Sequence, residues 1–317
     1  MAEKYAIGID VGGTNTKFGV VNKNGEILIQ DRIKTNEKEN VEGFIDVLAE
    51  KLQPMIDQFG GPEAFVGIGM GAPNANYYQG TIEYAANLKW KGIIPMADIM
   101  EEKFKIQTKL TNDANAAAVG EMQYGIAKGM KNFITITLGT GVGSGVIIDG
   151  KIVLGYNGFA GELGHVIVRN GGRLHQGTGL CGSLESYASA TGVRDTAIEF
   201  LQANPDINSL LSSYTIDELT SETVFKCAKQ GDVLANEVFE FTGQILGEAL
   251  ATFVHFSAPE AIVLFGGLTK AGDLIMKPTR QAMEDNLLQV FKNQVKILFS
   301  TLNEADAAIL GASALVW

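Results

Sequence analysis

The feature that most constrains this chain is a pattern that occurs twice. Residues 5–10 form a short apolar run that ends in a carboxylate, and a Gly-Gly-Thr turn and two further apolar runs follow it. Residues 132–138 form a second such run, followed by a glycine-rich turn at 139–145 and again by two apolar runs. Each copy predicts a β-meander with a tight first hairpin. Two copies predict a duplicated α/β unit whose hairpins face each other across a cleft.

Both hairpins have the composition of a phosphate site. Glycine lets backbone N–H groups approach an anion closely, and Thr14 and Thr16 add hydroxyl donors to the first hairpin. A third glycine turn, Gly266-Gly267, follows a predicted strand at 261–264, where ligands of such sheets collect. The spacing differs from the Walker and dinucleotide-binding fingerprints. A plain hairpin explains one copy equally well, so the recurrence is what favours a phosphate chain held from both sides.

A carboxylate lies between the two copies, at the start of a predicted helix. The alternating run 106–110 predicts a strand, and the alanine-rich run 116–122 predicts a helix that begins near Asn112 and Asp113. Free N–H groups and the helix dipole favour an ionised aspartate there. A helix cap is the simple explanation of this pair, and a catalytic carboxylate is the alternative.

Composition excludes several classes of protein. The chain has 317 residues, enough for two domains, and its formal net charge of −11 disfavours nucleic-acid binding as the main role. Its two cysteines are too few for a disulfide scaffold. The N-terminal run lacks the apolar segment of a signal peptide, and no apolar run is long enough to span a bilayer. We therefore expect a soluble cytoplasmic protein without membrane or nucleic-acid partners.

The remaining patterns predict scaffold. Apolar residues at helical spacing predict an amphipathic helix over 41–59 and a long buried helix over 233–253. An apolar run predicts a strand over 65–70, and the polar segment 203–220 is expected to be a surface excursion. Small residues at close intervals in 306–314 predict a helix that crosses another backbone segment closely.

Four more polar side chains are candidates for contact with a ligand. Glu162 and His165 lie three residues apart among glycines, which places them on one face if the segment is helical. Alone they are too few for a metal site. Glu185 lies in the first turn of a predicted helix, where dipole matching alone explains it. Asn87 either offers its amide to a hydroxylated ligand or forms a turn.

These motifs, in this order, resemble the ROK family of sugar kinases and repressors. The matching pieces are Asp10-Val-Gly-Gly-Thr, Asn112-Asp-Ala-Asn, Leu138-Gly-Thr-Gly-Val-Gly-Ser-Gly, Gly161-Glu-Leu-Gly-His, Leu184-Glu and Asp306-Ala-Ala-Ile-Leu-Gly-Ala. The resemblance implies an α/β protein with the actin-like ATPase (ribonuclease H-like) fold, in which two α/β domains from a duplicated βββαβα unit surround a nucleotide and sugar cleft. It implies an N-terminal domain over 1–112, joined by the C-terminal helix at about 303–317, and a larger domain over 113–302.

The resemblance also implies an activity. Because the first hairpin begins almost at residue 1, where repressors carry an extra DNA-binding domain, it points to the kinase branch. Within that branch the chain is most similar to glucokinases, which form glucose 6-phosphate from glucose and ATP. Asp113 is the implied general base, and Asp10 is the implied ligand of Mg²⁺, through water.

The predicted site residues fall into two groups. Those predicted to bind the sugar are Asn87, Asn112, Asp113, Glu162, His165 and Glu185. Those predicted to bind ATP are Asp10, Gly12, Gly13, Thr14, Thr16, Lys17, Gly139, Thr140, Gly141, Gly266 and Gly267. Carboxylates, an imidazole and amides complement the hydroxyl groups of a pyranose, which both donate and accept hydrogen bonds.

Two departures from the family pattern alter these expectations. Relatives bind a structural zinc through the histidine of Gly-His and three cysteines, whose positions here hold Gln176, Thr178 and Ser183. Cys181 falls outside the pattern, so we expect no zinc, a loop held by glycines, hydrogen bonds and packing, and another partner for His165. The second departure is the Ala-Pro-Asn run at 72–74, where many relatives have glycine after the proline.

Three functions remain open at this point. The first is a kinase of glucose. The second is a kinase of N-acetylmannosamine, N-acetylglucosamine, mannose or fructose, because the family positions do not separate these sugars. The third is a non-catalytic sugar sensor or an actin-like assembly protein, although a sensor tolerates loss of the base, and a filament protein needs no set of sugar ligands. We expect a sugar and ATP as small-molecule partners, and a homodimer.

Overall fold

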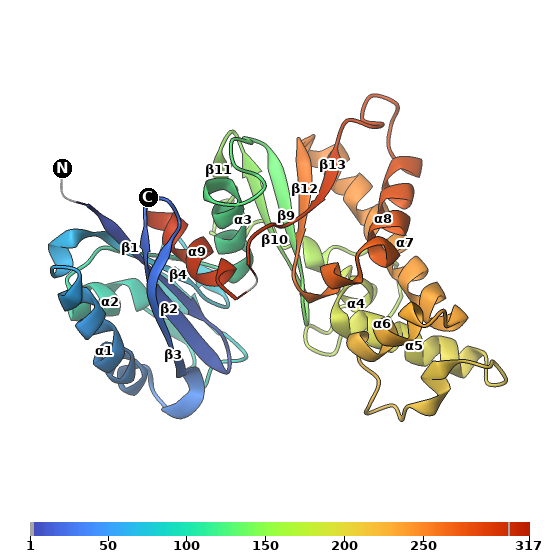
Figure 1. The fold of residues 1–317 in the computed structure, drawn as a ribbon, viewed down its shortest axis with the longest axis horizontal. Helices are drawn as coiled ribbons and strands as arrows, with labels where there is room; N and C mark the ends of the chain where they lie inside the picture. The colour runs from blue at the N-terminus through green and yellow to red at the C-terminus, as the bar shows by residue number, and fades with distance from the viewer. Residues whose placement is uncertain (1–2, 304) are drawn as a thin grey trace. The chain divides into compact units, whose positions relative to one another are not determined.

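Two five-stranded sheets form the framework of the fold (Figure 1). The computed structural model describes residues 3–303 and 305–317, so residue 304 of the predicted C-terminal segment and residues 1–2 of the predicted first domain lie outside it. The strands of the first sheet are β1 (Tyr5–Val11), β2 (Asn15–Asn22), β3 (Ile27–Lys34), β4 (Phe65–Gly71) and β8 (Thr108–Thr111). Those of the second sheet are β9 (Phe133–Leu138), β10 (Val142–Ile148), β11 (Lys151–Ile152), β12 (Ala261–Phe265) and β13 (Lys296–Phe299).

The two sheets have the same strand order. The first is β3-β2-β1-β4-β8 and the second is β11-β10-β9-β12-β13. In the first sheet β1 pairs antiparallel with β2 and parallel with β4, and β4 pairs parallel with β8. In the second, β12 pairs parallel with both β9 and β13. This equivalence confirms the duplicated α/β unit that the repeated meander predicts.

The described helices are α1 (Val41–Gln58), α2 (Met96–Phe104), α3 (Asp113–Gln123), α4 (Glu185–Ala188), α5 (Ala190–Ala203), α6 (Ser221–Lys229), α7 (Val233–Ser257), α8 (Asp273–Asp285) and α9 (Ala307–Ser313). Most of these helices lie between strands of one sheet, whereas α3 follows the last strand of the first sheet and α9 follows the last strand of the second. A small third sheet contains β5 (Ala75–Asn76), β6 (Thr81–Glu83) and β7 (Ile93–Ile94). The predicted helices near 41–59 and 233–253 are therefore confirmed as α1 and α7. Within the described ranges, no helix is both long enough and apolar enough to cross a membrane.

The contacts within the chain define two compact units. The first contains the described residues of Met1–Lys131, together with Gly145–Gly161 and Ser300–Trp317, and the second contains Asn132–Ser144 and Glu162–Phe299. The predicted boundary after residue 112 stays a prediction, because grouping by contacts does not identify a hinge. Helices α1 and α2 share one apolar core with strands of the first sheet, which buries Phe44, Leu48 and Leu52 of α1.

Helix α9 packs directly on the backbone of the first unit. A Cβ atom at Gly8 of β1 would lie 2.0 Å from the carbonyl oxygen of Ile309, and one at Gly69 of β4 would lie 1.9 Å from that of Ala312. A Cβ at Gly120 of α3 would lie 2.7 Å from the Cα of Gly311. Only glycine permits such close approach. The predicted close crossing of the 306–314 helix is confirmed, and it fixes α3, which carries Asp113, against the sheet.

Candidate active site

The first half of the candidate site lies at the carboxyl edge of the first sheet. In the register of the parallel strands, Asp10 of β1 is opposite Gly71 of β4, and Gly71 is opposite Thr111 of β8. Helix α3 begins two residues after Thr111, at Asp113. The fold therefore brings Asp10 and Asp113, which are 103 positions apart in the sequence, to the same edge of one unit.

The two carboxyl groups influence each other electrostatically. Burial and then the charge of Asp113 raise the pKa of Asp10 from 3.8 to about 6, although the positive charge of Lys17 lowers it in part. Lys17 is the antiparallel partner of Asp10 in the β1–β2 register. Two carboxylates with one lysine leave excess negative charge, which a cation bound there would offset.

At the start of α3, Asn112 and Asp113 have different roles, and only one of them is the helix cap. Asn112 is the helix cap, because it has an extended backbone and its side-chain oxygen accepts the N–H of Asn115 at 2.7 Å. Asp113 is the first helical residue, and its carboxylate accepts the N–H of Ala114 at 2.8 Å. Desolvation by the surrounding protein raises the pKa of Asp113. Hydrogen bonds from the backbone N–H groups of Ala114 and of Asp113 itself lower the pKa in part. The Asp113 side chain still contacts solvent. The helix N-terminus thus does not alone set its charge, contrary to expectation.

The first glycine hairpin is fixed by a residue that sequence reasoning missed. Asn36 follows β3, and its amide donates to the carbonyl oxygens of Gly13 at 2.5 Å and Asn87 at 3.0 Å. A Cβ at Gly13 would lie 3.1 Å from the Asn87 carbonyl oxygen, so Asn87 packs against the turn. Thr16 is buried, and its hydroxyl pairs with that of Thr35 at 2.8 Å. The structure therefore brings Asn87 to the hairpin, whereas the Thr16 hydroxyl points into the protein.

The second half of the site is organised around the second glycine hairpin, in the second unit. The N–H of Val142, directly after the turn, donates to Oε2 of Glu185 at 2.7 Å. A Cβ at Gly164 would lie 2.0 Å from the Val142 carbonyl oxygen, so the Glu162–His165 segment packs on the same residue. Val142 thus brings together Glu185 and the Glu-Leu-Gly-His segment, and their predicted role as ligands of one sugar stays a prediction.

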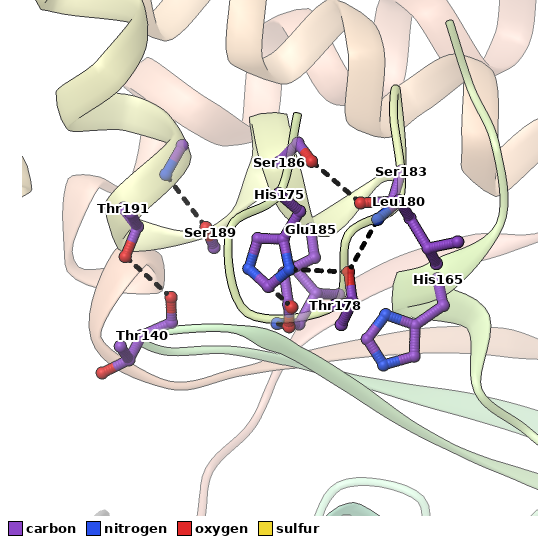
Figure 2. A network of polar contacts seen from close by, with 12 residues as sticks. Thr140, His165, His175, Thr178, Leu180, Ser183, Glu185, Ser186, Ser189 and Thr191 are labelled. Atoms are coloured by element: carbon purple, nitrogen blue, oxygen red, sulfur yellow. Dashed lines mark hydrogen bonds and ion pairs between the residues drawn. The ribbon is translucent and has the colours of Figure 1, made fainter. Parts of the chain in front are cut away.

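Helix α5 and a third glycine turn hold the second hairpin. The N–H of Ala190 donates to the carbonyl of Gly139 at 2.8 Å, and the Thr191 hydroxyl donates to that of Thr140 at 3.1 Å (Figure 2). A Cβ at Gly266, which has a φ of 107°, would lie 2.7 Å from the Leu138 carbonyl oxygen. The Gly266-Gly267 turn therefore lies beside the hairpin at the carboxyl edge of the second sheet.

Two glycines have no structural reason to be glycine. Within the described part of the chain, a Cβ at Gly139 or Gly267 would have no atom within 4 Å, and neither residue has a positive φ. Gly12, by contrast, approaches the carbonyl oxygen of Asn15, where a Cβ would lie at 2.9 Å. The N–H of Gly139 donates to the Gly141 carbonyl oxygen at 3.0 Å, so what Gly139 offers is open space beside the backbone, which the close approach of a phosphate group requires. This observation supports the predicted phosphate role of the second hairpin and the third turn.

Glu162 is the N-terminal cap residue of a single 3₁₀ turn, η3 (Leu163–His165), and His165 is the last residue of that turn. Oε2 of Glu162 is 3.7 Å from Nε2 of His165, which is close enough for one hydroxylated ligand to contact both. Nδ1 of His165 is buried, and no hydrogen-bond partner reaches it among the described residues. The new partner predicted for His165 in place of zinc is therefore not found at Nδ1.

The side chains near His165 do not fit a structural zinc. The hydroxyl of Thr178 contacts Nδ1 of His175 at 2.9 Å, and that of Ser183 contacts the Ser186 hydroxyl at 2.9 Å (Figure 2). Cys181 is exposed, and in the part of the chain that the structure covers no three His, Cys, Asp or Glu side chains converge on a metal position. Zinc prefers thiolate and imidazole ligands in a tetrahedral set, which these residues do not supply.

The loop is instead held by polar contacts around Arg173. The backbone of the loop forms isolated β-bridges between Ile167 and Ser183 and between Leu174 and Cys181. The Arg173 guanidinium donates to both carboxylate oxygens of Glu199, to two carbonyls and to a threonine hydroxyl, at 2.6 to 3.1 Å. It also lies 4.7 Å from the ring centre of Tyr187. Such a network of charge-assisted bonds orders a loop without metal.

The fold and the glycine hairpins define a class of protein. Two sheets of identical order, each with a glycine hairpin after its first strand, form the actin-like ATPase fold. The ROK family model matches residues 6–317, and the chain belongs to the ROK family.

Named relatives include kinases and a repressor. A glucokinase of Halalkalibacterium halodurans is 35% identical over 100% of this chain and 96% of its own length. The structure of a Streptomyces griseus ROK glucokinase in complex with glucose and AMPPNP is 30% identical, covers 98% of each chain and has a TM-score of 0.78. A xylose repressor of Caldicellulosiruptor bescii is 27% identical over 98% of this chain and 77% of its own length.

Proposed function

We propose that this protein is an ATP-dependent sugar kinase that phosphorylates glucose to glucose 6-phosphate. The observation that carries the proposal is the placement of Asp113 at the first position of α3, at the same sheet edge as Asp10. The similarity to glucokinases over the full chain supports the choice of glucose. A repressor among the relatives makes a sugar sensor the alternative, but a sensor has no need of a basic carboxylate at this position.

Asp113 is the general base in this proposal. A sugar hydroxyl loses its proton to the Asp113 carboxylate as its oxygen attacks the γ-phosphorus of ATP, and the bond to the β-phosphate oxygen breaks. A raised pKa strengthens a carboxylate as a base, and desolvation supplies that raise here. The N–H of Ala114, which donates to the carboxylate, stabilises the ionised form that acts as the base. The geometry thus matches the task of phosphoryl transfer, which depends chiefly on positioning.

Asp10 is the residue suited to hold Mg²⁺. Its half-buried carboxyl has a pKa raised to about 6, in part by the charge of Asp113, so a divalent cation beside it would relieve this repulsion. Carboxylate and water oxygens are the ligands that Mg²⁺ prefers. When bound, the ion would neutralise charge on the phosphate groups, and Gly13 and Gly267 would contribute backbone N–H groups to the same task. The N–H groups of Gly12 and Gly139 already donate to Asn15 and Gly141, so these two glycines would contribute space for the close approach of a phosphate.

Glu162, His165 and Glu185 are the proposed sugar ligands of the second unit. Glu185 is 13% exposed and accepts one backbone N–H, so its carboxylate keeps further acceptor sites for hydroxyl groups. Nε2 of His165 is 3.7 Å from Oε2 of Glu162, so one sugar hydroxyl would reach both side chains. Asn112 and Asn87 are proposed to contribute from the first unit.

A coupled ADP-release assay with ATP, Mg²⁺ and a panel of hexoses and acetamido-hexoses tests the proposal. Glucose should give the highest kcat/KM, and Asp113→Asn should lower kcat at least about 100-fold, as expected for loss of a general base. Asp273→Asn is the matched control, because Asp273 is also the first residue of a helix, α8, and lies outside the proposed site. No turnover with any sugar, or near-normal turnover by Asp113→Asn, would contradict the kinase proposal, and a higher kcat/KM with another sugar would contradict glucose.

A further inference from the structure

We infer that His175 is a positioning residue that holds the carboxylate of Glu185 in its ligand-binding orientation. The inference rests on the proposed function of Glu185 as a sugar ligand, but the geometry behind it lies entirely within the second unit. Nε2 of His175 is 3.1 Å from Oε1 of Glu185 (Figure 2). The N–H of Val142 holds Oε2 at 2.7 Å. The carboxylate is therefore fixed at both oxygens, from two different segments.

The protonation of the imidazole follows from its two neighbours. The Glu185 oxygen is an acceptor, so Nε2 must carry the proton that faces it. Nδ1 contacts the Thr178 hydroxyl at 2.9 Å, and that hydroxyl oxygen accepts the N–H of Leu180 at 3.4 Å. A neutral imidazole then accepts the Thr178 proton at Nδ1. The contacts thus select the Nε2–H tautomer, in the way that outer partners orient the histidines of other sites.

His175 is itself held by the short turn that carries it. Its N–H donates to the Leu180 carbonyl at 2.8 Å, and its carbonyl accepts the N–H of Gly179 at 2.8 Å. The imidazole is 24% exposed, so it is shielded in part from competing water. Two residues earlier, the bonds of Arg173 fix the start of the turn. The turn therefore presents His175 in one orientation.

Two fixed oxygens leave Glu185 competent for a ligand. A carboxylate accepts about four hydrogen bonds, and the described contacts with His175 and Val142 use one position on each oxygen. A carboxylate that is already oriented loses little conformational freedom when a sugar binds. Removal of His175 should therefore weaken sugar binding and leave ATP binding unchanged.

The first measurement does not involve a sugar. The backbone amide resonance of Val142 reports on its bond to Glu185, so His175→Ala should shift it and speed its hydrogen exchange in the ligand-free protein. His175→Gln should leave it close to wild type, because the glutamine amide supplies an N–H at a similar reach. His255→Ala, which removes an imidazole from α7 of the same unit, is the control and should leave it unchanged. A wild-type Val142 resonance in His175→Ala would overturn the inference.

The second measurement is steady-state kinetics with the sugar that the wild-type enzyme prefers. His175→Ala should raise the sugar KM about 10-fold, with the ATP KM within about twofold of wild type, and His175→Gln should restore most of the loss. Thr178→Val keeps the imidazole but removes its Nδ1 partner, so it should raise the same KM about threefold, and it carries the test if His175→Ala does not fold. Equal rises in both KM values, or no rescue by glutamine, would overturn the positioning role.

The two measurements separate this inference from the proposed function. If the wild-type protein phosphorylates no sugar, the kinase proposal fails, and the Val142 resonance still decides whether His175 holds Glu185. If the wild-type protein is an active kinase and His175→Ala retains both the Val142 resonance and the sugar KM, the inference fails alone.

Discussion

Oε2 of Glu185 occupies the space that a side chain on Gly141 would need, since a Cβ atom there would lie 2.2 Å from this oxygen. The same oxygen accepts the N–H of Val142, the next residue along the hairpin. The proposed sugar ligand thus rests on the proposed phosphate hairpin. The glycine at 141 is required by a carboxylate rather than by the conformation of the turn.

Gly141→Ala should therefore weaken sugar binding more than nucleotide binding. The new methyl group must displace the Glu185 carboxylate, which loses its bond to Val142, and we expect the sugar KM to rise about 10-fold or more. Gly139→Ala is the comparison, because a methyl group there meets no described atom within 4 Å and should leave the sugar KM within about twofold. An unchanged sugar KM in Gly141→Ala would show that Glu185 is not a ligand in this orientation.

The raised pKa of Asp10 predicts a pH dependence of stability. The folded protein holds a proton on Asp10 up to about pH 6, whereas the unfolded chain releases it near 3.8, so the contribution of this group to stability falls as the pH rises from about 4 to about 6. Asp10→Asn should remove that part of the dependence. The measurement is the difference between wild-type and variant unfolding free energies across this range, and a constant difference would contradict the assignment.

The same pKa predicts how nucleotide binding depends on pH. If ionised Asp10 holds Mg²⁺, the affinity for Mg·ATP should fall about 10-fold for each pH unit below about 6, since protonation competes with the cation. Titration calorimetry between pH 5 and 8 measures this, with Asp10→Asn as a weak binder whose affinity varies little with pH. A wild-type affinity that is flat through pH 6 would exclude Asp10 from the metal site.

Arg173 should contribute more to stability than its place in a loop suggests. Its side chain is 10% exposed and bonds Glu199 and several backbone groups, so Arg173→Ala should destabilise the protein by about 2–3 kcal/mol. Arg194→Ala is the control, because Arg194 lies in α5 with 35% exposure and should change stability by less than about 0.5 kcal/mol. Thermal or urea unfolding of both variants provides the comparison, and equal losses would argue against the network.

Removal of metal should leave the fold intact. Because the residues around His165 do not form a zinc-binding set in the described chain, treatment with a strong chelator should leave the Tm unchanged in the absence of nucleotide. Elemental analysis of the purified protein should find far less than one zinc per chain. Stoichiometric zinc together with a fall in Tm on chelation would overturn this expectation.

Much of the fold could be predicted because its signals are local. Glycine spacing marks both hairpins, and apolar periodicity marks α1 and α7, since turns and amphipathic helices depend on neighbouring residues. The strands β5 and β7 escaped prediction because two residues do not form a pattern. The roles of Asn112 and Asp113 also needed the structure, because adjacent polar residues at a helix start differ only in backbone conformation.

Asn36 and His175 could not be identified as site residues from local sequence patterns. Strand register places Asn36 beside the first hairpin, and a closed loop places His175 beside Glu185. The β2–β3 register places Lys34 opposite Asn15, so counting two residues onward would have located Asn36 beside the first hairpin. His175 offered no such signal. Its contact with Glu185 depends on a turn that closes through the bridge between Leu174 and Cys181, which no periodicity in a glycine-rich segment indicates.

The close packing of α9 has a consequence for biosynthesis. The first unit cannot complete its interior until residues 307–313 have left the ribosome, because β1, β4 and α3 are shaped to receive that helix. The earliest part of the chain to be made is thus among the last to mature. Until α9 is available, the glycine-lined surface of β1 and β4 that receives this helix stays uncovered in the nascent chain.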